Sequence, residues 1–176
     1  MYPIVRMVKE LAVQSRKPRL PFLGTHVSHH ICWPWDLDIW LELNNGRSLT
    51  LYDLGRIPLG LRVGLVPVMR RNRWALTMAG VSVRWRRRTR VFDKVEIHSR
   101  CVGWDDRFLY IEQSMWHRGQ ANSAALYRAA VTDRNGLLPT AKVLAAMGAE
   151  AASPELPAHV RAWIEADATR PWPPET

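Results

Sequence analysis

Residues 45–63 read NGRSLTLYDLGRIPLGLRV, a segment whose apolar side chains cover nearly every side of a helix. A helix that is apolar all round is normally buried inside a protein. Asn44 or Asn45 can cap its start, because an asparagine side-chain oxygen accepts a hydrogen bond from a free N–H of the first turn. Pro58 is expected to kink or divide the helix, and Gly64 marks its end. The sequence therefore predicts one long central helix that is enclosed by the rest of the chain.

The residues after this helix have the pattern of strands joined by tight turns. We expect four strands, at about 73–89, 94–104, 107–117 and 120–132. The breaks at 104–107 and 117–120 are typical of hairpins, which make neighbouring strands antiparallel. A curved antiparallel sheet is a natural cover for a buried helix, so the predicted fold class is α+β.

Shorter elements flank this central unit. Within residues 1–20, apolar side chains between Ile4 and Ala12 recur at helical spacing and predict an amphipathic helix. Residues 22–35 are rich in β-branched and aromatic side chains and predict a strand. Two more helices are expected at 140–147 and 158–166, the second in a C-terminal extension, 150–176. We expect residues 1–176 to form a single domain, a common size for one.

Composition limits the classes of function. The net charge of +9, with the bases concentrated before residue 150, attracts anions such as nucleic acid, an anionic membrane or a phosphorylated small molecule. Because the predicted N-terminal helix is amphipathic, peripheral contact with a membrane is a further hypothesis. No apolar run approaches the length that spans a bilayer, and no signal peptide is expected. Cys32 and Cys101 are one distant pair, which favours a reducing compartment, so we expect a cytoplasmic protein.

Several blocks of residues carry a family resemblance. They are Trp35-Asp36-Leu37-Asp38, Asn44-Asn45-Gly46-Arg47, Leu49 to Arg56, Gly103 to Glu112, and Glu155-Leu156-Pro157 with Trp163. Together they resemble the hotdog-fold acyl-CoA thioesterases, most closely the 4-hydroxybenzoyl-CoA thioesterase-like branch that includes thioesterase superfamily member six-like proteins. The similarity spans roughly residues 1–167. It implies a hotdog fold, a curved antiparallel sheet wrapped around a long central helix, in a homodimer or homotetramer with active sites at the subunit interface.

The same resemblance implies hydrolysis of the thioester of an acyl-CoA. In the family, the second Asp of the Asp-x-Asp motif is the catalytic carboxylate, which is Asp38 here. This sequence departs from the family where a Gly-His pair usually precedes the double Asn, because Leu41 and Glu42 stand there. Ser48 replaces a tyrosine that commonly follows. A carboxylate donates no hydrogen bond unless it is protonated, so the alternative is a hotdog protein that binds acyl-CoA or a protein partner without turnover.

The position of Asp38 shortly before the helix suits this chemistry. The free N–H groups at the helix start, near Asn44, Asn45 and Gly46, can hold the oxyanion that forms from the thioester carbonyl. A carboxylate beside them can attack the carbonyl or activate water, which makes Asp38 the predicted nucleophile or general base. In the simpler alternative, Asp36 and Asp38 end a strand and accept hydrogen bonds from loop amides.

Two other carboxylates lie near the predicted site. Glu42 is expected to assist Asp38 or to raise its pKa by repulsion, or else it is a solvated loop residue. Asp53 lies on the central helix, but its spacing to Arg56 favours an ion pair within that helix.

Basic residues follow the helix in an alternating pattern. Arg84, Arg86, Arg88 and Arg90 alternate along a predicted strand and should project from one face. Guanidinium groups suit the phosphates of coenzyme A, so we expect these arginines, with Trp40, to contact the substrate, a solvated basic face being the alternative. Nucleic acid is not expected, since no aromatic side chain shares that face and no nucleic-acid motif is present. No metal or redox cofactor is expected.

Overall fold

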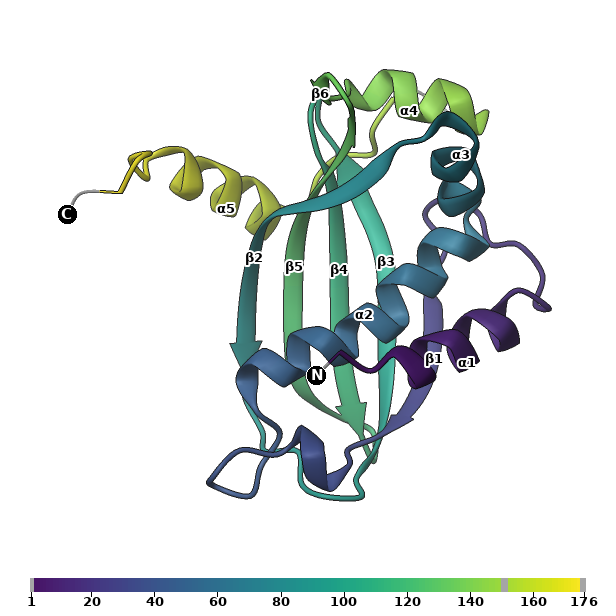
Figure 1. Cartoon of the computed structure of the whole chain (residues 1–176). Helices are drawn as coiled ribbons and strands as arrows, with labels where there is room; N and C mark the ends of the chain where they lie inside the picture. The colour runs from purple at the N-terminus through teal and green to yellow at the C-terminus, as the bar shows by residue number, and fades with distance from the viewer. Residues whose placement is uncertain (1, 150–151, 175–176) are drawn as a thin grey trace.

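The fold is described from a computed structural model, which covers residues 2–149 and 152–174. Its elements in chain order are α1 (Ile4–Gln14), β1 (His26–Ile31), a short 3₁₀ helix η1 (Pro34–Asp36), α2 (Asn45–Arg62), α3 (Leu65–Asn72), β2 (Ala75–Trp85), β3 (Lys94–Trp104), β4 (Leu109–His117), β5 (Gln120–Asp133), β6 (Gly136–Leu137), α4 (Thr140–Met147) and α5 (Ala158–Ala168). α2 crosses the sheet on one side, with α1 beside it (Figure 1).

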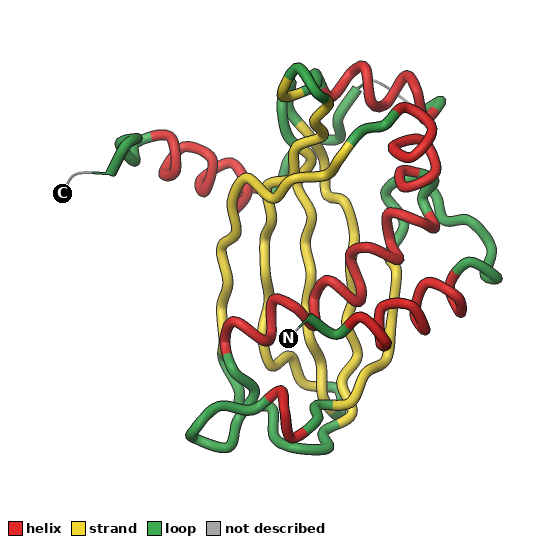
Figure 2. The backbone as a smooth tube through the Cα atoms, in the orientation of Figure 1, coloured by secondary structure: helices red, strands yellow, loops and turns green. Residues whose placement is uncertain are grey.

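The strands form one antiparallel sheet in the order β1-β3-β4-β5-β2, and β6 pairs with β5. The predicted hairpins β3–β4 and β4–β5 are confirmed. The register shifts within three of the strand pairs, as between Cys101 and Gly103, and such bulges bend a strand and increase its twist. The sheet thereby curves around α2 (Figure 2), which confirms the predicted α+β hotdog fold.

The central helix is buried as its apolar pattern predicts. Leu51, Tyr52 and Leu54 have no exposed surface and belong to the main core with residues of β3, β4 and β5. Gly55 allows a close approach to the sheet, because a Cβ there would lie 2.6 Å from Ser99 Oγ. α2 is therefore seated directly against the inner face of β3.

The course of the chain around the end of α2 differs from the prediction. α2 runs continuously through Pro58, so the proline does not divide it. The break comes at Gly64, which has a left-handed φ of +88°, and α3 follows over residues that were not predicted to be helical. Pro67 lies in the first turn of α3, where a missing N–H costs no hydrogen bond.

Two predicted strands are shorter in the structure. The strand expected at 22–35 extends only over β1, and the strand expected at 73–89 only over β2. The chain leaves the sheet after Trp85 because the N–H groups of Arg86 and Arg87 both donate to the carbonyl of Asn122, at 2.8 and 3.0 Å.

The predicted helices near the C-terminal end are confirmed as α4 and α5. α5 packs against the sheet through a second apolar cluster, in which Val160 is fully buried and Trp163 and Ile164 contact residues of β3, β4 and β5. Among the described residues, no helix combines the length and the apolarity needed to cross a bilayer.

Candidate functional site

The beginning of α2 is capped by a side chain. Asn44 Oδ1 accepts from the N–H of Arg47 at 3.0 Å, and the Asn44 N–H donates to the carbonyl of Asp36 at 3.0 Å. The capping alternative for Asn44 is thus confirmed. Asn45 and Gly46 open the helix, where backbone N–H groups lack intrahelical acceptors and the positive end of the helix dipole lies.

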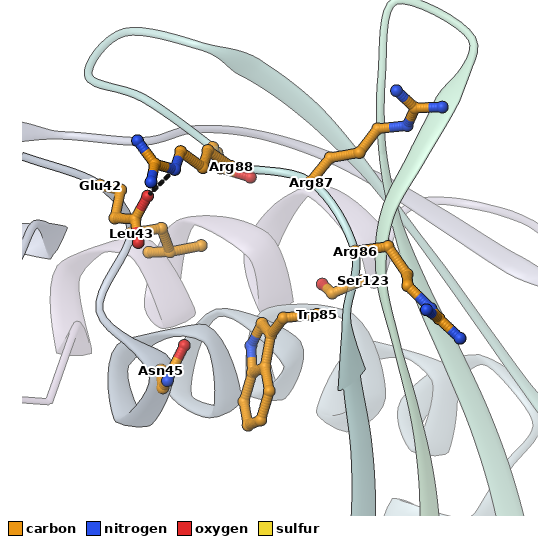
Figure 3. A pocket seen from close by; sticks show the side chains of 9 residues that line it. Glu42, Leu43, Asn45, Trp85, Arg86, Arg87, Arg88 and Ser123 are labelled. Atoms are coloured by element: carbon orange, nitrogen blue, oxygen red, sulfur yellow. Dashed lines mark ion pairs between the residues drawn. The ribbon is translucent and has the colours of Figure 1, made fainter.

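A cleft of about 210 Å³ lies at this end of α2 (Figure 3). Glu42, Leu43 and Asn45 line one side of it, and Trp85 with residues 86–89 lines the other. Two contacts far apart in sequence build the cleft. The Leu43 N–H donates to the carbonyl of Thr89 at 2.8 Å, and Thr89 Oγ1 accepts from Asn122 Nδ2 of β5 at 2.8 Å. The loop before α2 and the loop after β2 are therefore held against each other at the edge of the sheet.

Glu42 is engaged in an ion pair across this cleft. Its Oε2 lies 2.9 Å from Nε of Arg88, and the backbones of Glu42 and Arg90 form an isolated antiparallel bridge. Figure 3 shows the two side chains meeting at the top of the cleft. The charge of Glu42 is consequently balanced by a neighbour, and the residue is not a free, solvated loop glutamate.

Asp38 begins the turn that leads to Glu42. Its Oδ1 accepts from the N–H of Trp40 at 2.8 Å and from the N–H of Glu42 at 3.4 Å, and its own N–H donates to the Glu42 carbonyl. Asp38 therefore accepts from loop amides, as the simpler alternative holds, and it does not line the cleft. Its Oδ2 takes part in no hydrogen bond with the described residues. Leu41 in this turn has a left-handed φ of +59°, a conformation that suits the glycine which the family usually carries there.

The tip of the turn is apolar and faces solvent. Ile39, Trp40 and Leu41 are all exposed, so Trp40 lies outside the cleft. The tryptophan that lines the cleft is Trp85, whose indole N–H donates to Ser48 Oγ at 3.1 Å. Ser48 is fully buried and donates to the carbonyl of Asn45 at 2.6 Å. Trp85 was not predicted as a site residue.

The prediction that Arg84, Arg86, Arg88 and Arg90 project from one face of a strand is wrong. Only Arg84 lies on β2, where it lines a separate groove that also contains Arg100 and Trp163 of α5. Arg86, Arg87 and Arg88 surround the cleft from the loop after β2, and the Arg90 N–H donates to Asp93 Oδ2 at 2.8 Å. The stripe fails because the chain leaves the sheet at Trp85, so strict alternation ends there.

The buried carboxylate of Asp36 holds together the segments that surround the start of α2. Asp36 has no exposed surface, and its two oxygens accept from Arg6 Nη2 at 2.7 Å, from Arg47 Nε at 2.8 Å and from the N–H of Trp33 at 3.0 Å. These bonds join α1, η1 and the first turn of α2. Sequence reasoning did not find this cluster, because nothing local connects Arg6 to Asp36.

A second buried polar cluster lies in the middle of α2. Arg56 pairs with Asp53, as the spacing predicts, donates to Gln113 Oε1 at 3.1 Å, and stacks with its guanidinium carbon 4.1 Å from the ring centre of Tyr127. Burial raises the pKa of Asp53, an effect that the Arg56 charge opposes. Burial also raises the pKa of Tyr127 to about 12. Among the described residues, no three His, Cys, Asp or Glu side chains gather in a way that could hold a metal ion.

Comparison with known proteins identifies relatives in sequence. Residues 32–164 match the model of the thioesterase-like superfamily. Protein THEM6 of Xenopus laevis is 32% identical over 146 residues, which cover 81% of this chain and 69% of that protein. Protein THEM6 of Drosophila melanogaster is 28% identical over 145 residues, which cover 81% of this chain and 73% of that protein.

Solved structures share the fold at low identity. The probable thioesterase YbaW of Escherichia coli has a TM-score of 0.61 at 17% identity, over 69% of this chain and 96% of that one. A thioesterase of Thermus thermophilus, complexed with coenzyme A and Zn, has a TM-score of 0.58 at 20% identity, over 65% of this chain and 89% of that one. With three quarters of its length matched by the family model, the chain belongs to the thioesterase-like superfamily.

Proposed function

We propose that this protein hydrolyses the thioester of an acyl-CoA to a free acid and coenzyme A. Membership of the superfamily supports thioesterase-like activity at a general level. One observation supports acyl-CoA hydrolysis in particular. The first turn of α2, whose N–H groups have no intrahelical acceptors, opens on a cleft beside the turn 38–42, which carries Asp38 and Glu42.

The chemistry assigns a role to each part of this arrangement. The thioester carbonyl oxygen accepts from the N–H groups of Asn45 and Gly46, which stabilise the negative charge of the tetrahedral intermediate. Asp38, in the turn beside the cleft, removes a proton from the water that attacks the carbonyl carbon, or attacks that carbon itself and forms an anhydride that water then hydrolyses to the free acid. In both routes the thiolate of coenzyme A leaves and takes up a proton. The bonds to Asp38 Oδ1 hold the carboxylate in one orientation and leave Oδ2 available for this role. Glu42 pairs with Arg88 and so holds that arginine in place at the cleft.

The loop after β2 is the proposed binding site for the phosphates of coenzyme A. Arg86, Arg87 and Arg88 all line the cleft, and guanidinium groups form paired hydrogen bonds with phosphate oxygens. Arg84 lines a separate groove, and Arg90 is not among the residues that line the cleft. We therefore assign the phosphates to residues 86–88 rather than to the stripe 84–90.

We also propose that two copies pair along β2. A volume of about 210 Å³ is smaller than the pockets that usually enclose organic ligands, which span about 300–1,000 Å³. β2 is an 11-residue edge strand whose outer side has no paired strand among the described residues, and Trp85 ends it at the cleft. A partner strand there would extend both the sheet and the wall of the cleft. A homodimer, or a homotetramer built from it, therefore suits an acyl chain better than the single chain.

The test is release of free thiol from short, long and aromatic acyl-CoAs. Asp38→Asn should lower kcat by about 10²–10⁴-fold, the usual contribution of a general base, with unchanged folding by circular dichroism. The matched control is Asp133→Asn, because Asp133 Oδ1 also accepts from a backbone N–H two residues on, at 2.8 Å, but far from the cleft. Equal rates for wild type and Asp38→Asn across all chain lengths would discard the assignment of Asp38.

A second candidate function is binding of acyl-CoA or a protein partner without turnover. The ion pair between Glu42 and Arg88 favours it, because a paired carboxylate cannot donate a hydrogen bond to the thioester as a histidine would. This alternative expects saturable binding of a CoA ester in calorimetry, weakened by Arg88→Gln, and no thiol release from any ester.

A further inference from the structure

α1 exposes an apolar stripe to solvent, while the side of the helix that faces the protein carries both polar and apolar residues. Ile4, Val5 and Val8 are 64%, 84% and 60% exposed, whereas Glu10 and Gln14 are buried. Helical geometry places Ile4, Val5, Val8 and Ala12 on one side of the helix, so these exposed residues form a continuous apolar stripe. An apolar stripe of this kind on a protein surface marks an interaction site.

The orientation of α1 is set by the side that faces the protein. Arg6 donates to the buried carboxylate of Asp36 at 2.7 Å, and Met7 packs into the main core. Gln14 Nε2 donates to Glu10 Oε2 at 3.4 Å beneath the helix. Turning the stripe inward would break the Arg6–Asp36 ion pair and expose Met7. The outward position of the stripe is therefore a fixed property of the fold.

The exposed charged residues of α1 and of the segment after it are all basic. Lys9 has 72% of its side chain exposed, and Arg16, Lys17 and Arg19 are exposed in the segment after α1. Glu10 is the only acidic residue before Asp36 in the sequence, and it is buried. The surface formed by α1 and residues 16–19 thus combines apolar side chains with positive charge and presents no acid.

We propose that α1 docks on the surface of an anionic lipid bilayer. Ile4, Val5 and Val8 would enter the boundary between headgroups and acyl chains, while Lys9 and residues 16–19 would contact lipid phosphates. The charge complementarity selects an anionic membrane over a second copy of this chain, whose corresponding surface would carry the same positive charge. α1 lies near β1, away from the β2 edge (Figure 1), so docking is compatible with pairing of two copies along β2. The inference is independent of the proposed hydrolysis.

The test is sedimentation of the full chain with vesicles. Wild type should bind vesicles of phosphatidylcholine with phosphatidylserine, bind pure phosphatidylcholine more weakly, and lose affinity as salt shortens the screening length. The double variant Val5→Gln/Val8→Gln should bind the anionic vesicles roughly tenfold more weakly or worse, because burial of two valine side chains is lost. The matched control is Trp172→Gln, which removes an 89% exposed apolar side chain outside α1 and should leave binding unchanged.

Several outcomes would overturn the proposal. One is wild type that binds neither vesicle, and another is a Val5→Gln/Val8→Gln variant, folded by circular dichroism, that binds as wild type does. If the double variant lowers the molar mass in light scattering while vesicle binding is absent, the stripe is an interface between copies of this chain. Tight, salt-sensitive binding to duplex DNA without vesicle binding would assign the surface to nucleic acid instead.

Discussion

Replacing Asp36 with asparagine removes a negative charge that has no exposed surface. Two guanidinium groups, those of Arg6 and Arg47, donate to its carboxylate at 2.7 and 2.8 Å, and the N–H of Trp33 donates at 3.0 Å. The substitution keeps the shape of the side chain. Asp36→Asn places a neutral amide beside the largely buried guanidinium groups of Arg6 and Arg47. The amide has one oxygen to accept with, so its NH₂ group must face one of the two cations.

The expected cost follows from the burial of the partners. Breaking a buried ion pair by removing one member costs about 3–5 kcal/mol. The side chains of Arg6 and Arg47 are 18% and 15% exposed, so water reaches part of each guanidinium and the lower end of this range applies. We expect Asp36→Asn to lower the free energy of unfolding by about 3 kcal/mol. With a urea dependence of about 2 kcal/mol per M, the unfolding midpoint falls by about 1.5 M.

Urea unfolding followed by tryptophan fluorescence measures this change. Asp133→Asn serves as the control, because Asp133 accepts one backbone N–H in a surface turn and should lose about 1 kcal/mol or less. Hydrogen exchange should also speed up in α1, since Arg6 loses its anchor. In the background Arg6→Met, the cost of Asp36→Asn should shrink, because one stranded cation is gone. A cost below about 1 kcal/mol, or one equal to that of Asp133→Asn, would refute the account of Asp36 as the junction of α1, η1 and α2.

Further expectations concern backbone strain, close packing and pH. Leu41→Gly should raise the free energy of unfolding by up to about 1 kcal/mol, because Leu41 is exposed and held at a left-handed φ of +59° that glycine adopts without strain. The melting temperature should rise accordingly, and a lower melting temperature would contradict this. Gly55→Ala should destabilise by about 1–3 kcal/mol in thermal unfolding, because its Cβ would lie 2.6 Å from Ser99 Oγ, and wild-type stability would show that α2 is not seated so closely. Burial, with nearby positive charge, lowers the pKa of His26 and of His30 from 6.5 to about 4. The unfolded chain therefore binds protons that the folded chain does not, so stability should fall as the pH drops from about 6.5 towards 4, by about 1.4 kcal/mol per pH unit for each histidine. Urea midpoints between pH 7 and pH 4.5 measure this loss; His30→Gln should flatten it, and an unchanged slope would count against the assignment.

Local sequence patterns predicted the framework of this protein well. α2 was predictable because its apolar spacing and its Asn44 cap lie within a few residues of one another. The two hairpins were predictable from short turns between alternating strands. α3 was missed because it spans only eight residues, two of them buried. Pro67, shortly after Gly64, is also typical of the residues that follow the end of a helix.

The amino-acid sequence by itself determined the enclosed helix, the antiparallel sheet and the acidic turn ahead of the helix, since propensity, periodicity and capping act between near neighbours. Tertiary structure alone decided which side chains meet at the cleft. Asp36 pairs with Arg6 and Arg47, which lie 30 and 11 residues away in the sequence. The predicted arginine stripe ends at Trp85, because the next two N–H groups donate to the carbonyl of Asn122 and the chain leaves the sheet there. The outward face of α1 was decided in the same way, by the ion pair between Arg6 and Asp36. Contacts between distant segments depend on how the whole chain packs, and no local pattern encodes them.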